Sequence, residues 1–396
     1  MENILIKQKF GFVQNFTPVW FATVLGFGGI ALTSSLIAKV FGATWLNPVS
    51  IVLTYLDFGL FIFLFVTWLS KLIFYSPTIL KELQHPVVAG FHSLMPAAMI
   101  MISIVFSRIG AMFPLWQHRE IAISFWIAGA IFEILLLTIT IYFLITNEKM
   151  SINAMNGGWL VPPVAALLTP VAGVKLTELI SSEAISANIL WVNYFFFGIG
   201  VFVFLLMAVA LFSKVFFFEK LDPKILPSLW IMLVPFSLMS ISLALFARET
   251  GTYLQSGLGS SLMDLVPLIN PMLIGIGVWL LILLIALTIY YLRKLSLPYG
   301  AGWWAFIFPT GSVCLASLTQ GSLTNQTFFS WTGLGIYIFL IALTLIVLYR
   351  TIKGLVQSIS PHGNRAKHKA SYTLYQKGED NEPVMELPDV VLPQTP

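Results

Sequence analysis

Two carboxylates stand inside long apolar stretches of the sequence. Asp57 lies within the apolar run 50–74, and Glu133 lies within the run 120–146. In a membrane, such a carboxylate commonly acts as a proton relay; the alternative is a protonated side chain that hydrogen-bonds a neighbouring helix. The second interpretation is favoured, because the segments that hold both residues are expected to face away from the centre of the protein. A proton relay through Asp57 or Glu133 stays open.

Residues that bind metals or other cofactors are scarce. His85 and His92 are seven positions apart, but a haem bridged by histidines usually needs ligands from two helices. A single cysteine, Cys314, excludes an intramolecular disulfide. The sequence has no phosphate-binding Gly-rich loop with Lys and no His-Glu-x-x-His zinc motif. It therefore predicts no enzyme activity, no metal and no cofactor.

The composition identifies the solvent around these residues. Of the 396 residues, 58% are hydrophobic and 10% are charged, and the mean hydropathy is +0.90. So little polar surface cannot cover a soluble globule, which predicts an integral membrane protein. Apolar runs of about 20 residues predict ten transmembrane helices. Their expected spans are 18–38, 50–74, 86–107, 120–146, 159–175, 188–213, 227–247, 271–292, 302–320 and 331–350.

The distribution of Lys and Arg predicts the orientation. If the N-terminus is cytoplasmic, 16 of the 21 basic residues fall on the inside of this ten-helix arrangement and 5 fall outside. The positive-inside rule then places both termini in the cytoplasm. The net charge of +4 therefore reflects topology and gives no sign of nucleic-acid binding. Residues 1–350 are predicted to form the transmembrane domain, and 351–396 a mostly disordered cytoplasmic tail whose basic part could contact lipid headgroups.

Prolines divide the predicted helices into two sets. Each proline frees a backbone carbonyl, which in hydrocarbon is tolerated only where protein or a water-filled cavity surrounds the helix. Even-numbered helices have no interior proline, since Pro48 and Pro271 stand at their starts. The pattern predicts an all-α membrane protein built of five helical hairpins, with five bent inner helices around a central pore; ordinary packing irregularity is the alternative. Interior prolines of the odd-numbered helices are Pro96, Pro162, Pro163, Pro170, Pro235 and Pro309, and the first helix has Gly26, Gly28 and Gly29 instead.

Neutral polar side chains are expected to line the path. His92 is the only ionisable residue well inside an odd-numbered helix. A neutral lining cannot hold a cation with a ring of carboxylates, but it could pass anions or neutral solutes. The expected hydroxyl groups belong to Thr23, Ser93, Thr169, Ser237, Ser240, Thr310 and Ser312.

Four stretches, at the first, third, fifth and ninth predicted helices, carry a family resemblance. They read NFTPVWFATVLGFGGIAL, QHPVVAGFHSLMP, GGWLVPPVAALLTPVAG and GWWAFIFPTGS. In order and spacing they resemble the tellurite-resistance/dicarboxylate transporter family, which includes slow-type anion channels, malate permeases and sulfite efflux pumps. The resemblance implies a homotrimer in the plasma membrane in which each subunit passes small inorganic anions or small carboxylates. A proton-coupled carrier of dicarboxylates such as malate, or of sulfite, is the alternative.

The ninth stretch also implies a gate. In the family, this motif carries a phenylalanine that plugs the pore, and the aromatic residue directly before Pro309 is Phe308. Phe306 is the second candidate, because a shift of two residues turns a helix by about 200° and only one ring can face the path. Trp303 and Trp304 are expected at the membrane interface. Ordinary packing of Phe308 is the alternative in a chain with 33 phenylalanines.

Phe27 stands in the GFGG stretch where many relatives have a Gly-Thr-Gly-like sequence, so it is expected to narrow or reshape one end of the path. The predicted pore-lining and kink positions are Gly26, Phe27, His92, Pro96, Pro163, Pro170, Pro235, Pro309 and Thr310.

Overall fold

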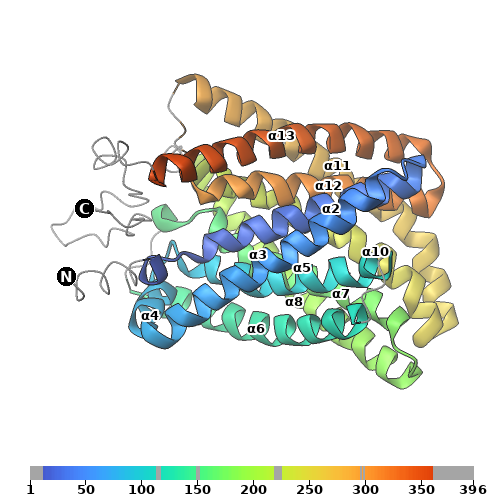
Figure 1. The fold of residues 1–396 in the computed structure, drawn as a ribbon. Coiled ribbons are helices and arrows are strands. Elements are labelled where there is room, and N and C mark those ends of the chain that lie inside the picture. The colour runs from blue at the N-terminus through green and yellow to red at the C-terminus, as the bar shows by residue number, and fades with distance from the viewer. Residues whose placement is uncertain are drawn as a thin grey trace, which may run out of the picture.

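The computed structural model describes residues 12–112, 117–148, 152–217, 225–294, 297 and 299–359. Among these residues, ten helices are long and apolar enough to cross a membrane (Figure 1). This confirms the predicted fold class of an all-α protein with ten transmembrane helices. The helices are α2 (Ala22–Phe41), α3 (Leu46–Phe74), α5 (Leu94–Arg108), α6 (His118–Thr146), α7 (Val161–Leu176), α8 (Glu183–Phe217), α10 (Leu233–Tyr253), α11 (Ser256–Lys294), α12 (Ile307–Thr324) and α13 (Thr327–Ile359).

These helices form an inner and an outer layer. In the spans of α2, α5, α7, α10 and α12, between 83% and 94% of the most apolar window is buried. In α3, α6, α8, α11 and α13, the buried share is only 28% to 33%. Large apolar side chains such as Phe63, Ile131 and Trp279 project from the outer helices and are more than half exposed, which suits contact with lipid. Ile131 is the least exposed of the three, at 54%.

The inner helices form a closed ring in which α2 contacts α5, α5 contacts α7, α7 contacts α10, α10 contacts α12 and α12 contacts α2. Each inner helix begins with a 3-10 segment, and these segments adjoin one another in the same order, so all five inner helices start at one end of the ring. We call this the near end and the opposite one the far end. Each inner helix also packs against the outer helix that follows it. The 3-10 segments are η1 (Pro18–Phe21), η2 (Ala89–Ser93), η5 (Gly157–Leu160), η8 (Trp230–Met232) and η9 (Ala301–Phe306).

Four of the inner prolines stand where the 3-10 segment gives way to the α-helix. Pro96, Pro163, Pro235 and Pro309 are each the third residue of their α-helix. An N–H in the first turn has no acceptor within the α-helix, so a residue without an N–H costs little there. Pro170 lies farther along, in the interior of α7. The prolines thus mark a change of helix type at the near end more often than a bend at mid-membrane.

The expectation that even-numbered helices lack interior prolines is wrong for α11. This helix begins at Ser256 and contains both Pro267 and Pro271. Pro271 leaves the carbonyl of Pro267 without its usual backbone donor, four residues along the helix. The side-chain amide of Gln320 on α12 donates to that carbonyl at 3.1 Å. A neighbouring helix therefore satisfies the freed group, which allows the proline inside an outer helix.

Helix α13 continues to Ile359, beyond the predicted end of the transmembrane domain at residue 350. Its last turns pack against Tyr299, whose hydroxyl donates to Thr351 Oγ1 at 2.6 Å. This contact explains why the helix extends past its apolar run. The remainder of the predicted tail, residues 360–396, lies outside the described residues.

Candidate functional site

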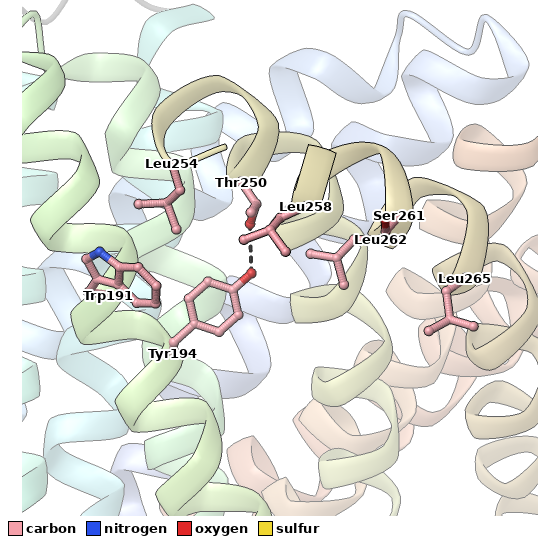
Figure 2. Close-up of a pocket in the computed structure, with 8 residues that line it drawn as sticks. All are labelled: Trp191, Tyr194, Thr250, Leu254, Leu258, Ser261, Leu262 and Leu265. Carbon is pink, nitrogen blue, oxygen red and sulfur yellow. Dashed lines mark hydrogen bonds between the residues drawn. The ribbon is translucent and has the colours of Figure 1, made fainter. Parts of the chain in front are cut away.

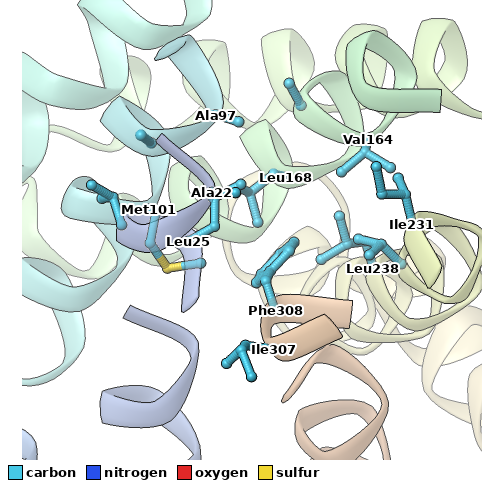
Figure 3. Packing of buried hydrophobic residues seen from close by; sticks show 14 of the residues in the cluster. Ala22, Leu25, Ala97, Met101, Val164, Leu168, Ile231, Leu238, Ile307 and Phe308 are labelled. Atoms are coloured by element: carbon cyan, nitrogen blue, oxygen red, sulfur yellow. The ribbon is translucent and has the colours of Figure 1, made fainter. Parts of the chain in front are cut away.

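Phe308 lies where side chains from all five inner helices meet. It is only 5% exposed. In Figure 3 its ring points into the space between Leu25, Leu168 and Leu238, while the neighbouring Ile307 points away from that space. The seam at the centre of the ring is therefore apolar and filled at this level. The side chains drawn there come from α2 (Ala22, Leu25), α5 (Ala97, Met101), α7 (Val164, Leu168), η8 and α10 (Ile231, Leu238) and α12 (Phe308).

Helix α2 has a glycine, Gly29, beside the ring of Phe308. A Cβ atom at Gly29 would lie 3.5 Å from Phe308 Cδ2, and one at Gly26 would lie 3.0 Å from Trp304 Cε3. The two glycines thus leave room for the aromatic rings of η9 and α12. The first and ninth stretches of the sequence analysis form one packed unit.

The other aromatic residues of the ninth stretch lie toward the near end. The Phe306 ring packs edge-on against Trp230, with centroids 5.0 Å apart, and lies 5.8 Å from Trp303. Trp304 is 1% exposed and its ring lies 5.2 Å from that of Phe27, which is half-buried. Both tryptophans lie in η9, at the near end of the ninth span, and both are buried among other side chains. The Trp304 indole can pack against α2 because Gly26 has no side chain and leaves space for the ring.

Most of the predicted lining hydroxyls are bonded within their own helices. Thr310 Oγ1, for example, donates to the carbonyl of Phe306 at 2.7 Å. A hydroxyl that donates its proton to a carbonyl has none left for an anion. Within the described residues, the hydroxyls of Ser93 and Ser240 are buried and make no hydrogen bond. The bonded hydroxyls are those of Thr23, Thr169, Ser237, Thr310 and Ser312.

Asp57 and Glu133 point toward the inner ring. Both are fully buried, and Asp57 Oδ2 would lie 3.0 Å from a Cβ atom at Gly28 of α2. Glu133 lies close to Ser93 at the start of the third span. Asp57 makes no hydrogen bond to another described residue, whereas Glu133 lies within hydrogen-bonding reach of Ser93, on the segment that precedes α5. Each outer helix has one face against the ring, and the carboxyls are on that face.

His92 belongs to a buried charged group at the near end. The Lys71 ammonium donates to Glu82 Oε1 at 2.6 Å and to the carbonyl of Phe16 at 2.7 Å. His92 Nε2 lies 3.4 Å from Glu82 Oε2. Burial by itself raises the pKa of Glu82, but the neighbouring His92 and Lys71 hold that pKa below its ordinary value. Glu82 thus stays a carboxylate that links the start of the second inner helix, α5, to α3.

Glu82 stands on a short helix that was not predicted from the sequence, α4 (Ser76–Gln84). A proline in its first turn and the alternation of apolar and polar residues in SPTILKELQ are the signals that indicate it.

The structure also contains a pocket of about 320 Å³ away from the ring centre, between α8, α10 and α11 (Figure 2). The hydroxyls of Tyr194 and Thr250 are hydrogen-bonded across it at 2.7 Å. None of the predicted site residues lines it. Its walls are otherwise mostly apolar, formed by Trp191, Leu254, Leu258, Ser261, Leu262 and Leu265.

The chain is similar to known membrane transport proteins over most of its length. A family model described as voltage-dependent anion channel matches residues 15–352. An uncharacterized transporter of Methanocaldococcus jannaschii is 26% identical over 86% of this chain and 95% of its own length. A sulfite efflux pump of Arthroderma otae is 22% identical over 86% of this chain and 91% of its own length. The matched region includes η1, the first nine membrane-spanning helices, most of α13 and Phe308.

Proposed function

The chain belongs to the voltage-dependent anion channel family, and we propose that it passes small anions along the axis of the five inner helices, with Phe308 as the gate. The family resemblance seen in the sequence is thereby confirmed, and with it the function of a membrane anion transporter. The observation that carries the proposal is the position of Phe308, whose ring lies in the seam where the five inner helices meet.

The chemistry of the seam suits a closed gate. An anion in a narrow apolar passage loses most of its hydration, and no described side chain in the seam replaces it. The near end differs, because the positive ends of five helix dipoles converge there. An anion is therefore attracted to the near end and meets its main barrier at the level of Phe308. Moving the ring aside lowers that barrier.

The similarity to the sulfite efflux pump of Arthroderma otae supports sulfite as one substrate of this chain. Sulfite and small carboxylates share the features that such a path requires, namely a small size and a delocalised negative charge. We extend the proposal to a homotrimer in the plasma membrane with both termini cytoplasmic, each subunit having its own path. The family resemblance and the excess of basic residues in the segments that the sequence predicts to be cytoplasmic support this arrangement.

A proton-coupled carrier is the second candidate function. It is favoured by one observation, that Asp57 and Glu133 are fully buried and face the inner helices. A carboxyl in such a place can gain and lose a proton as the adjacent helix moves. A passive channel needs no such group.

Anion uptake into liposomes that contain the purified protein distinguishes the two functions. For a channel, we expect sulfite, nitrate and chloride to equilibrate without accumulating, whether or not a pH gradient is present. Weakly hydrated nitrate should enter faster than chloride, because it gives up its water at lower cost. Accumulation of sulfite against its own gradient, driven by protons and lost in Glu133→Gln or Asp57→Asn, would establish the carrier. Absence of any anion flux would refute both.

A further inference from the structure

The far ends of three inner helices bring together a group of charges that the proposed function does not yet use. Arg108 is the last residue of α5, Lys175 and Glu178 stand at the end of α7, and Arg248 and Glu249 lie near the end of α10. We call these five residues the far-end cluster. It holds three cations and two carboxylates, so one positive charge is in excess.

The two carboxylates of the far-end cluster are engaged by Lys175 and Arg248. Lys175 forms an ion pair with Glu178. Arg248 approaches Glu178 with Nη2 at 3.7 Å from Oε1, and its Nε lies 3.2 Å from Glu249 Oε1. Both cations therefore have an acidic partner within 4 Å.

Arg108 has no such partner among the described residues. Its charge interacts with those of Glu178 and Arg248, which makes Arg108 part of the same charged group. Its Nε and Nη2 atoms are buried and make no hydrogen bond within the described part of the chain. Leaving buried donors of a charged group unbonded is costly. These two nitrogens form one edge of the guanidinium, the two-pronged edge that binds two oxygen atoms of one anion.

The direction of the inner helices gives a second reason for a cation here. All five run from the near end to the far end, so their negative dipole ends converge at the far end. An anion that leaves or enters the path there meets partial negative charges. An uncompensated arginine at this end offsets that repulsion.

We propose that Arg108 is the anion-binding site at the far end of the path, and that it selects anions with two oxygens on one atom, such as sulfite or a carboxylate, over halides. The proposal rests on the anion path through the ring and adds the substrate class and its docking residue. Glu178 and Glu249 are paired with Lys175 and Arg248. They therefore do not bind the Nε and Nη2 atoms of Arg108, and an anion can bind there reversibly.

Binding to the detergent-solubilised protein tests the site without relying on transport. A ligand that binds only the folded state raises the melting temperature, and at a given concentration the rise is larger the tighter the ligand binds. We expect sulfite and acetate to raise the melting temperature of the native protein more than chloride does at equal ionic strength. Arg108→Gln should abolish this difference. Arg108→Lys, which keeps the charge but lacks the two-pronged edge, should respond to the three anions alike.

Lys39→Gln serves as the matched control, because Lys39 is an exposed cation in the last turn of α2, at the same end of the ring but outside the far-end cluster. It should keep the preference for sulfite and acetate. In liposomes, Arg108→Gln should raise the half-saturating sulfite concentration at least about tenfold with a smaller change in maximal rate.

Sulfite stabilisation of Arg108→Lys and Arg108→Gln equal to that of the native protein would overturn the site, as would a native protein that responds to all three anions alike. If the native protein binds sulfite through Arg108 but passes no anion in liposomes, the transport function fails and the binding site stands. If it transports anions and Arg108→Gln has an unchanged half-saturating concentration, only the site fails.

Discussion

Replacing Phe308 by alanine is expected to raise anion flux at least about tenfold. The ring lies in the seam between the five inner helices, and its removal leaves space where Leu25, Leu168 and Leu238 now contact it. Water can then enter the seam and the anion keeps part of its hydration. Lowering the barrier by as little as about 1.4 kcal/mol gives this increase. Chloride or sulfite flux into liposomes, normalised to the amount of folded protein, measures it.

Phe306→Ala is the control for this experiment. It removes the same number of atoms two residues away, but its ring packs on Trp230 and Trp303 at the near end. We expect its flux to stay within about twofold of the native value. A twofold change corresponds to less than half of the difference in activation free energy that a tenfold change requires. A Phe308→Ala protein that assembles correctly and shows unchanged or lower flux contradicts the gate.

Gly29→Leu is expected to lower anion flux at least about tenfold. A Cβ atom at Gly29 would lie 3.5 Å from Phe308 Cδ2, which is an ordinary contact, but the larger leucine side chain extends beyond it into the seam. An added side chain of this size in a packed core forces neighbouring groups to shift or holds them in place. Here it holds the Phe308 ring in the closed position. The measurement is the same liposome flux, with the melting temperature recorded to confirm folding.

Gly59→Leu separates this effect from the general cost of leucine for glycine in a helix. Gly59 lies in the interior of α3, and no atom lies within 4 Å of a Cβ placed there. Its substitution should leave flux unchanged. Combining Gly29→Leu with Phe308→Ala should restore flux to at least the native level, because no ring is left for the leucine to hold in the closed position. A double variant as slow as Gly29→Leu alone would show that Gly29 acts elsewhere.

The layers of the fold follow from the sequence because lipid imposes a simple rule. Apolar length predicts the ten spans, and the odd-numbered helices are the buried ones, as the prolines and glycines indicate. The rule for even-numbered helices failed at Pro271, because the partner that satisfies the freed carbonyl is Gln320, far away in the sequence. Such a contact exists only in the folded chain.

The details of the site depend on contacts that spacing does not show. The hydroxyl of Thr310 was expected to face the path, yet it is bonded to its own helix. Asp57 was expected to face away from the ring, yet it lies against Gly28. A helical pattern predicts which residues share a face, but the direction of that face is set by the neighbouring helix. Arg108 becomes a candidate binding residue only in the folded structure. There Lys175 and Arg248 are paired with acidic side chains, and Arg108 is not paired with any described one.

The central claim is that anions cross at the level of residue 308, and blocking that position chemically tests it most directly. The buried Cys314 is first replaced by alanine, and Phe308→Cys is introduced in that background. We predict that Phe308→Cys conducts more than the background protein, and that a charged, thiol-specific methanethiosulfonate reagent then abolishes this conductance, more slowly when nitrate occupies the path. Phe306→Cys should conduct like the background protein and be unaffected by the reagent. Conductance of Phe308→Cys that persists after complete modification of the thiol would show that anions cross elsewhere.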